Sequence, residues 1–574
     1  MKILWQYLKE YKKQLIIGPI FKLIEAVLEI LVPTIMAKQL IDIGIASGDR
    51  GYIFKIGALM LALAVIGLGC ALVCQYNASV ASQGFGTNLR NAVFEHICAL
   101  SFKELDKFGA ASLLNRITND INILQQSVAM VIRLVIRAPF IVLGSFVMAS
   151  VINWKLGLII LATAPIFALI IWLIMRATIP MYRVIQQKLD KLSSTAAQSF
   201  AGVRVIRAFA KKREEREKFD ATAEDFAKLS VRVGKISAIL NPATLLLLNF
   251  LIISVLWAGG LQVHAGDMTK GDIIAVTTYI SYIMTAMLVV ADLIILFIRA
   301  GVARDRVCEL LQTAPSLAEG TESVAMAAGE SAIEFRHVSF SYNGGEKALE
   351  NISFTLNRGE SLGIIGGIGS GKTTLVNLLA RFYDADEGEV FVLGENVKSY
   401  SFASLRAVMR VAMQKPFLFA GTVKENILQG KPGASEAEVT AAAETAQAAE
   451  FIAAKEGGLG ARVEAGGSNL SGGQRQRLSL ARAVIAGAPI LVLDDSVSAL
   501  DYATELRFRK ALKADYDGTL VMVSQRVSTI RDCNKILVLE DGRQVGFDSH
   551  EKLLKTCETY REIYTSQSKE EVAR

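Results

Sequence analysis

The residues with the clearest chemical potential form a glycine-rich segment in the second half of the chain. Gly366 to Thr373 has the sequence Gly-Gly-Ile-Gly-Ser-Gly-Lys-Thr, which fits the phosphate-loop pattern G-x-x-x-x-G-K-[ST]. A buried-strand pattern over 361–365 precedes it and a helical pattern over 374–382 follows. Backbone N–H groups of such a loop surround phosphate oxygens at a helix N-terminus. The segment therefore predicts a nucleoside triphosphate site, with a tight turn in an ordinary α/β domain as the alternative.

The loop also supplies the side chains that this chemistry needs. We expect Lys372 to contact the β- and γ-phosphates and the Thr373 hydroxyl to bind Mg²⁺. Asp494 and Asp495 end an apolar strand pattern over 490–493, and a carboxylate at that place holds Mg²⁺ in phosphate-loop proteins. The predicted nucleotide contacts of the loop are Gly366, Gly367, Ile368, Gly369, Ser370, Gly371, Lys372, Thr373 and Thr374.

A third motif, Leu470-Ser-Gly-Gly-Gln, lies between the phosphate loop and Asp494. The three motifs in this order resemble the nucleotide-binding domain of an ATP-binding-cassette (ABC) exporter, and the resemblance covers essentially the whole chain. It implies ATP and Mg²⁺ as cofactors, and a dimer in which each ATP lies between one phosphate loop and the opposing signature motif. The signature residues implied to act on the partner's ATP are Ser471, Gly472, Gly473 and Gln474. The chain thus looks like a half-transporter.

The resemblance places three further residues. Tyr342 stands where the family stacks an aromatic ring on adenine. Gln414 matches the glutamine that binds Mg²⁺ together with Thr373 and Asp494 and contacts the membrane domain. Asp501 matches the loop that signals between the two ATP sites.

Two positions depart from the family pattern at the γ-phosphate. Asp495 stands where the family has a catalytic Glu, which withdraws the carboxylate by about 1.5 Å. Gln525 stands where the family has a His, and an amide carries no charge and moves no proton at neutral pH. We interpret the pair as a degenerate site that binds ATP and hydrolyses it slowly, with sequence drift as the alternative.

The departures bear on the partner and the function. We predict a heterodimer whose second half-transporter supplies the Glu and the His, with a homodimer as the alternative. The leading function is ATP-driven export of lipophilic or cationic compounds, as in multidrug exporters. A lipid or peptide exporter of the same fold and an ATP-gated regulatory or channel-like protein are the alternatives. Nucleic acid is not an expected partner.

Composition accounts for the first half of the chain. Of 574 residues, 52% are hydrophobic and 20% are charged, which excludes disorder and a disulfide scaffold. Three uncharged runs are long enough to cross a bilayer, and three further runs of similar length contain a few charged residues. The six predicted spans are 14–37, 56–73, 133–152, 157–175, 236–263 and 273–298.

These patterns predict an all-α transmembrane domain of six helices followed by an α/β nucleotide-binding domain. The Lys- and Arg-rich segment between the fourth and fifth spans marks the cytoplasmic side, so both termini are expected in the cytoplasm of a bacterium, with the spans in its inner membrane. Long helical extensions and short coupling segments are expected on this side. The predicted ranges are 1–311 for the membrane domain, 312–331 for a linker, 332–574 for the nucleotide-binding domain, and 107–109 and 201–207 for coupling.

Acidic residues inside the predicted spans are the only sequence clue to the cargo. Glu25, Glu29 and Asp292 are costly in a membrane and usually face a cavity or a partner. They predict a cavity that prefers amphipathic cations. The alternative pairs Glu25 with Lys22, and Asp292 with Arg133 or Arg137 of a neighbouring helix.

Overall fold

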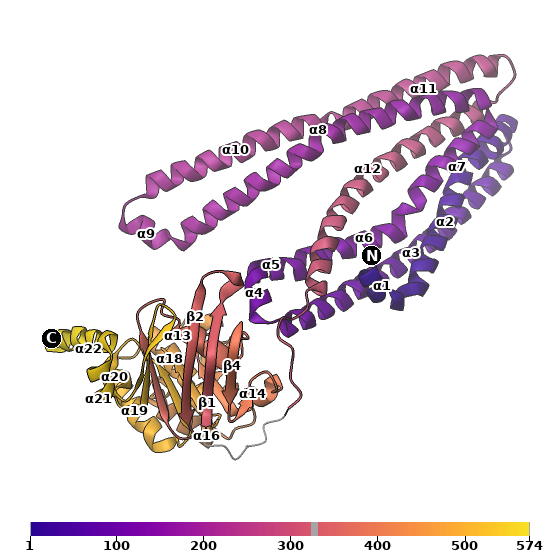
Figure 1. The fold of residues 1–574 in the computed structure, drawn as a ribbon. Helices are drawn as coiled ribbons and strands as arrows, with labels where there is room; N and C mark the ends of the chain where they lie inside the picture. Colours follow the sequence, from indigo (N-terminus) through magenta and orange to yellow (C-terminus); the bar gives the residue numbers. More distant parts are fainter. Residues whose placement is uncertain (1, 323–330, 573–574) are drawn as a thin grey trace. The chain divides into compact units, whose positions relative to one another are not determined.

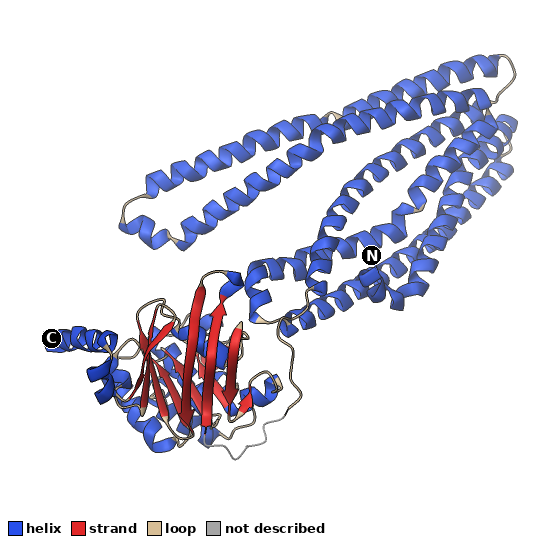
Figure 2. Cartoon of the chain, viewed as in Figure 1, coloured by secondary structure: helices blue, strands red, loops and turns tan. Residues whose placement is uncertain are grey.

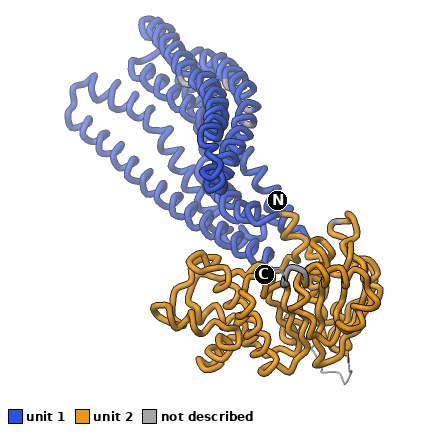
Figure 3. The backbone as a smooth tube through the Cα atoms, turned by 90° about the vertical axis from the view of Figure 1, so that its left-hand side faces the viewer, with its two compact units in different colours: residues 1–98, 109–313 blue, residues 99–108, 314–574 orange. Residues whose placement is uncertain are grey.

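The computed structural model describes residues 2–322 and 331–572 and contains two compact units. The first unit comprises Met1–Cys98 and Gly109–Thr313, and the second comprises Ala99–Phe108 and Ala314–Arg574 (Figure 3). The second unit therefore includes a short piece of the chain between the second and third predicted spans. Residues 323–330 of the predicted linker lie outside the described residues.

In its described residues the first unit consists of helices joined by short turns (Figures 1 and 2). Its long helices pack side by side around a core that contains Phe167, Val255 and Tyr279. The α-helices are α1 (Lys2–Leu8), α2 (Lys12–Ile35), α3 (Arg50–Ala99), α5 (Ala110–Asn115), α6 (Ile121–Met130), α7 (Arg137–Ile152), α8 (Trp154–Ala201), α9 (Val203–Ala208), α10 (Lys212–Ala238), α11 (Leu240–His264) and α12 (Lys270–Gln312).

Several of these helices are longer than a bilayer is thick. Helix α3 has 50 residues and α8 has 48, which corresponds to about 75 Å and about 72 Å at 1.5 Å per residue. The hydrocarbon core of a bilayer is only about 30 Å thick. Helices α8 and α10 run side by side and are joined through α9 (Figure 1). The predicted coupling segment 201–207 begins at the last residue of α8 and continues into α9. Helices of this length reach well beyond the thickness of a bilayer, and their extension into the cytoplasm stays a prediction.

Five helices of the described residues are long and apolar enough to cross a membrane. They include five of the six predicted spans. The remaining span, 14–37, is helical as α2, but Lys22, Glu25 and Glu29 make it too polar for the same criterion. Its crossing of the membrane stays a prediction.

Local side-chain chemistry sets where two of the spans begin. The Asn153 Oδ1 accepts hydrogen bonds from the backbone N–H groups of Lys155 and Leu156 at 3.0 and 3.2 Å, which starts α8. Thr269 and Asp272 form a capping box that starts α12. Both helices therefore start at the point where a polar connection meets an apolar run.

The second unit contains a mixed sheet of ten strands in its described part, in the order β5-β4-β1-β2-β12-β11-β3-β10-β9-β6. A separate two-stranded sheet pairs β7 with β8. The strands are β1 (Ser331–Ser341), β2 (Lys347–Asn357), β3 (Ser361–Gly366), β4 (Glu387–Val392), β5 (Glu395–Asn396), β6 (Met409–Ala412), β7 (Gly421–Thr422), β8 (Arg462–Val463), β9 (Ile490–Asp494), β10 (Thr519–Val523), β11 (Lys535–Glu540) and β12 (Arg543–Asp548).

The strands β11, β3, β10, β9 and β6 are parallel, and β9 is fully buried. A parallel sheet buried by helices brings the carboxyl ends of its strands to one edge, which is where ligands bind in such folds. The α-helices of this unit are α4 (Phe102–Phe108), α13 (Lys372–Leu379), α14 (Phe402–Val408), α15 (Val423–Leu428), α16 (Glu436–Thr445), α17 (Ala449–Ala453), α18 (Gly472–Val484), α19 (Tyr502–Asp515), α20 (Val527–Ile530), α21 (His550–Thr556) and α22 (Glu558–Val572).

Candidate nucleotide site

The glycine-rich loop connects β3 to α13, as its sequence predicted. Two of its glycines adopt positive φ angles, +83° at Gly369 and +94° at Gly371. A Cβ atom at Gly371 would lie 2.7 Å from the carbonyl oxygen of Ala348, so a larger residue is excluded there. The loop ends at the N-terminus of α13, where unpaired N–H groups and the helix dipole favour an anion.

The Lys372 ammonium lies inside this loop. It donates hydrogen bonds to the carbonyl oxygens of Gly366 at 2.9 Å and Gly367 at 2.5 Å, and to the Ser370 hydroxyl at 3.3 Å. Burial lowers the pKa of Lys372, and the nearby carboxylates of Asp494 and Asp495 oppose that shift. A phosphate in the loop would pair with this half-buried positive charge.

Asp494 is poised to hold a cation beside the loop. It ends β9, is 4% exposed, and accepts a hydrogen bond from the Thr373 hydroxyl at 3.4 Å. Burial raises the pKa of Asp494 to about 6, and the charge of Asp495 adds to the shift. With the side-chain oxygen of Gln414, this is a set of hard oxygen donors of the kind that Mg²⁺ prefers. The residues therefore fit the predicted magnesium ion.

Asp495 and Gln414 meet at the same edge, although 81 positions separate them in the chain. The Gln414 side-chain amide donates to Asp495 Oδ2 at 3.2 Å. Burial raises the pKa of Asp495, while the bond from Gln414 and the charge of Lys372 lower it. The backbone of Asp495 has a φ of +45°, an uncommon conformation for a residue other than glycine. Its side chain is thereby held at the edge of the sheet.

Gln525 follows β10, the strand between β3 and β9. Gln525 is exposed, and its side chain makes no hydrogen bond to any of residues 2–322 and 331–572. The order of the strands places the phosphate loop, Asp495 and Gln525 at the carboxyl ends of three adjacent parallel strands. The two positions that depart from the family pattern therefore lie at one edge of the sheet.

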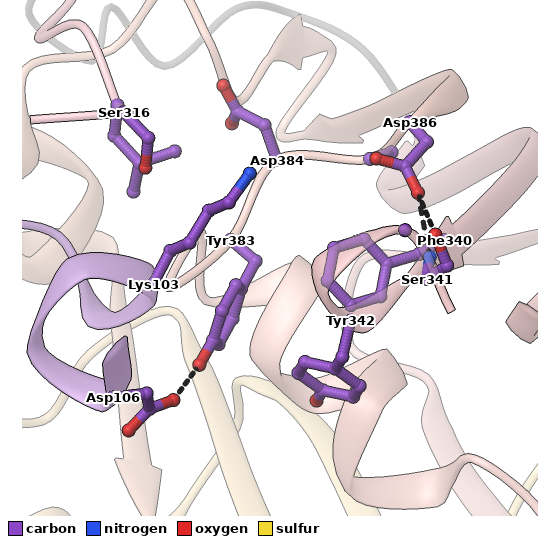
Figure 4. Close-up of a pocket in the computed structure, with 12 residues that line it drawn as sticks. Lys103, Asp106, Ser316, Phe340, Ser341, Tyr342, Tyr383, Asp384 and Asp386 are labelled. Carbon is purple, nitrogen blue, oxygen red and sulfur yellow. Dashed lines mark hydrogen bonds between the residues drawn. The ribbon is translucent and has the colours of Figure 1, made fainter. Parts of the chain in front are cut away.

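Tyr342 lines a cavity of about 430 Å³ in the second unit (Figure 4). Its ring makes edge-to-face contacts with Phe340 and Tyr383, at centroid distances of 4.9 and 5.3 Å. Lys103 and Asp106 of α4 line the same cavity, and Asp106 accepts a hydrogen bond from the Tyr383 hydroxyl at 2.5 Å (Figure 4). The volume of the cavity is within the range of small-molecule sites, but none of its described lining residues belongs to the phosphate loop.

The signature motif forms the start of α18. Ser471 and Gln474 form a capping box. The Ser471 hydroxyl accepts from the Gln474 N–H at 3.3 Å, and the Gln474 side-chain oxygen accepts from the Ser471 N–H at 3.0 Å. Gly472 and Gly473 form the first turn, so this helix N-terminus resembles the phosphate loop in its anion-binding chemistry. Asp501 caps α19 by accepting from the Thr504 N–H at 2.9 Å.

Known families match both parts of the chain. Residues 15–287 match the family described as "ABC transporter transmembrane region", and residues 349–498 match the family described as "ABC transporter". An uncharacterized ABC transporter ATP-binding protein of Mycobacterium tuberculosis is 33% identical over 582 residues, which covers 99% of this chain and 98% of that protein. This chain belongs to the ABC transporter family.

Other ABC proteins are similar over the same length. An ATP-dependent lipid A-core flippase of Haemophilus ducreyi is 30% identical, with 99% of this chain and 98% of that protein covered. The solved structure of a bacterial Atm1-family ABC exporter with ATP bound shares the fold, with a TM-score of 0.82, 24% identity, and coverage of 97% of this chain and 99% of that one. The predicted fold class, a helical transmembrane domain followed by a nucleotide-binding domain, is confirmed, and the chain is a membrane protein whose ATP-binding domain couples ATP hydrolysis to transport.

Three acidic residues were predicted to lie inside the membrane spans of this ABC protein, and two of them form ion pairs. Glu25 pairs with Lys22 at 2.7 Å, as the sequence alternative proposed. Arg137 pairs with Glu29 at 2.6 Å rather than with Asp292. Asp292 is exposed on α12 and has no ion pair within the described part of the chain. The sequence could not distinguish these outcomes, because helix packing decides which charges meet.

Sequence reasoning missed a junction between α4 and the segment after α12. Glu104 is buried and accepts hydrogen bonds from the Ser316 N–H and hydroxyl, at 3.4 and 3.3 Å. The Ser101 hydroxyl accepts from the Leu317 N–H at 3.1 Å, and the buried Arg381 donates to the Ala318 carbonyl at 2.6 Å. Only the neighbouring prediction of a coupling segment at 107–109 pointed toward this region.

Proposed function

We propose that this chain is one half of an ATP-driven ABC exporter that works as a heterodimer. Its own phosphate-loop site binds ATP and hydrolyses it slowly. Its signature motif completes a competent site on the partner. The observation that carries the proposal is that Asp495 follows β9 and Gln525 follows β10, so both lie at the edge of the sheet where the phosphate loop also lies.

The physical argument concerns the water that attacks the γ-phosphate. An Asp carboxylate is about 1.5 Å shorter in reach than a Glu carboxylate, and a misplacement on the order of 1 Å can lower a rate about 100-fold. The Asp495 carboxylate is also engaged by Gln414. Gln525 can donate a hydrogen bond to a phosphate oxygen but cannot accept and release a proton as imidazole does.

The remaining residues bind and orient ATP. Lys372 and the N–H groups of the phosphate loop neutralise phosphate charge, and Tyr342 supports the adenine ring. Thr373, Asp494 and Gln414 would hold Mg²⁺, which neutralises charge on the β- and γ-phosphates. Ser471 and the first turn of α18 would bind the γ-phosphate of the ATP held by the partner's phosphate loop. Asp501 would belong to the loop that signals between the two ATP sites of the dimer.

For the cargo, we propose a lipophilic or cationic compound, and the unpaired Asp292 supports it. A carboxylate without a counter-ion in a membrane helix attracts an amphipathic cation. Glu25 and Glu29 are neutralised by Lys22 and Arg137 and are weaker candidates for the cavity. We place the chain in a bacterial inner membrane with both termini in the cytoplasm.

Lipid export is the second candidate. It is favoured by the similarity to proteins named ATP-dependent lipid A-core flippases, at about 30% identity over nearly the whole chain. Lipid and cation cargo are distinguished by which compound stimulates ATP hydrolysis in proteoliposomes: a lipid of stated headgroup or a soluble lipophilic cation such as tetraphenylphosphonium.

The decisive experiment measures phosphate release by the purified chain alone and with the ABC half-transporter that co-purifies with it. We expect very low turnover alone and high turnover in the complex. In the complex, Ser471→Ala should abolish most turnover, whereas Lys372→Ala should leave a large part of it. Vigorous turnover by the chain alone, or the reverse order of the two variants, would refute the asymmetric arrangement.

A further inference from the structure

The C-terminal helix makes a two-point contact with the backbone that carries Gln525. The side chain of Gln567 on α22 donates from Nε2 to the carbonyl oxygen of Gln525 at 2.7 Å. Its Oε1 accepts from the backbone N–H of Val527 at 2.8 Å. One amide side chain thus uses both its donor and its acceptor on the same short segment, 40 positions away in the chain.

Within residues 2–322 and 331–572, the two backbone groups that Gln567 binds have no other hydrogen-bond partner in a strand or helix. Strand β10 ends at Val523, so the Gln525 carbonyl lies beyond the sheet. Val527 is the first residue of α20, a helix of four residues whose N-cap, Arg526, makes no side-chain capping bond. The first N–H groups of a helix need partners from outside it. Gln567 therefore supplies hydrogen bonds that the local sequence does not.

Other bonds hold the residues around these two backbone groups, including an ion pair between Arg526 and the buried Glu505 at 3.4 Å. The Ser524 N–H donates to the Ile364 carbonyl of β3 at 3.1 Å, and the Arg526 N–H donates to the Ser524 hydroxyl at 3.0 Å. The Thr529 hydroxyl donates to the buried Glu505 at 2.6 Å. Both ends of the segment are fixed to the core, and Gln567 fixes the carbonyl of the residue between them.

Helix α22 is itself well anchored. Tyr560 is fully buried, and its hydroxyl hydrogen-bonds to His550 Nδ1 at 2.7 Å. The Thr559 hydroxyl donates to Glu540 at the end of β11 at 3.0 Å. Gln567 lies two turns after Tyr560 and therefore on the same face of the helix. The packing of the C-terminal helix thus determines where the Gln567 amide lies.

We propose that Gln567 is a positioning residue of the ATP site: it holds the backbone of residues 525–527 so that the Gln525 side chain faces the γ-phosphate. This inference rests on the role proposed above for Gln525. It gives the C-terminal helix a part in distinguishing ATP from ADP, because only ATP carries the group that Gln525 would contact.

The test measures the affinities of the full-length chain for ATP and for ADP, with Mg²⁺, by displacement of a fluorescent nucleotide. Gln567→Met keeps the size of the side chain and removes both hydrogen bonds. We expect the ratio of ATP to ADP affinity to fall about three- to tenfold, which is the effect of losing about one net hydrogen bond to the γ-phosphate, with ADP affinity unchanged. The Gln525→Ala variant should lower the ratio as much, and the double variant no further.

The matched control is Thr565→Val on the same helix, whose hydroxyl bonds only to the Arg561 carbonyl of that helix. It should leave the ratio unchanged. Hydrogen exchange of the Val527 amide should accelerate in Gln567→Met and not in the control, which confirms loss of the contact in a folded protein. A Gln567→Met ratio equal to wild type, beside a lowered Gln525→Ala ratio, would overturn the positioning role. An unchanged Gln525→Ala ratio would instead overturn the proposed role of Gln525.

Discussion

Restoring the two departures at the γ-phosphate should convert the slow site into a fast one. The change is Asp495→Glu together with Gln525→His in the same chain. The added methylene extends the carboxylate by about 1.5 Å from a backbone that the structure holds at a positive φ. The longer side chain also moves the carboxylate away from Gln414, so the 3.2 Å bond that Gln414 makes to Asp495 is lost.

The size of the effect follows from reach and proton transfer. Correcting a misplacement on the order of 1 Å is worth about 100-fold in rate, or about 2.7 kcal/mol in the barrier. An imidazole at position 525 adds a group that exchanges protons near neutral pH, a contribution of about 100-fold where proton transfer limits the rate. We therefore expect Asp495→Glu alone to raise turnover at least tenfold, and the double variant to raise it further.

The assay uses two copies of the chain joined in one polypeptide, which ensures that each phosphate loop meets an intact signature motif. Phosphate release is measured in nanodiscs at saturating ATP and Mg²⁺. Asp495→Ala controls for removal of the bond from Gln414 without a longer carboxylate, and Lys372→Ala in the double variant should abolish the gain. A double variant that binds ATP normally yet hydrolyses it at the wild-type rate would refute the assignment of the two positions.

Three further predictions concern binding, the signature motif and the membrane charges. Because Mg²⁺ requires an ionised carboxylate and burial raises the pKa of Asp494 to about 6, Mg²⁺-dependent ATP affinity should fall as pH drops below that value, and calorimetry of Asp494→Asn should show no such dependence. Ser471→Ala removes a helix cap and should lower the free energy of unfolding by about 1 kcal/mol in thermal melts, while ADP binding to the same chain stays unchanged. Glu29→Gln leaves the Arg137 charge unpaired and should destabilise the protein by about 2 kcal/mol in nanodisc melts. The loss is smaller than for a fully buried ion pair because both side chains are partly exposed. Asp292→Asn, which breaks no ion pair among the described residues, should melt like wild type.

The motifs and the fold class could be predicted because their signals are local. The phosphate loop needs glycine where the backbone takes a positive φ, as at Gly369 and Gly371, and that requirement is visible in eight residues. The strand patterns 361–365 and 490–493 became β3 and β9, each of which ends one residue later than predicted. Apolar runs identify membrane helices because each residue of the run adds its own free energy of transfer from water to the bilayer, whatever the tertiary structure. The mixed charge of α2 blurs that signal.

What the sequence could not give are the contacts between distant residues. The bond between Gln414 and Asp495, the pairing of Arg137 with Glu29, and the hold of Gln567 on residues 525–527 each join separate elements. Spacing along the chain says nothing about them, because they depend on strand order and on which helix faces pack together. The sequence alone determined that the chain carries a phosphate loop, a signature motif and a run of membrane helices. The tertiary structure decided which side chains meet at the carboxyl ends of β3, β9 and β10, since only folding brings those strand ends to one edge.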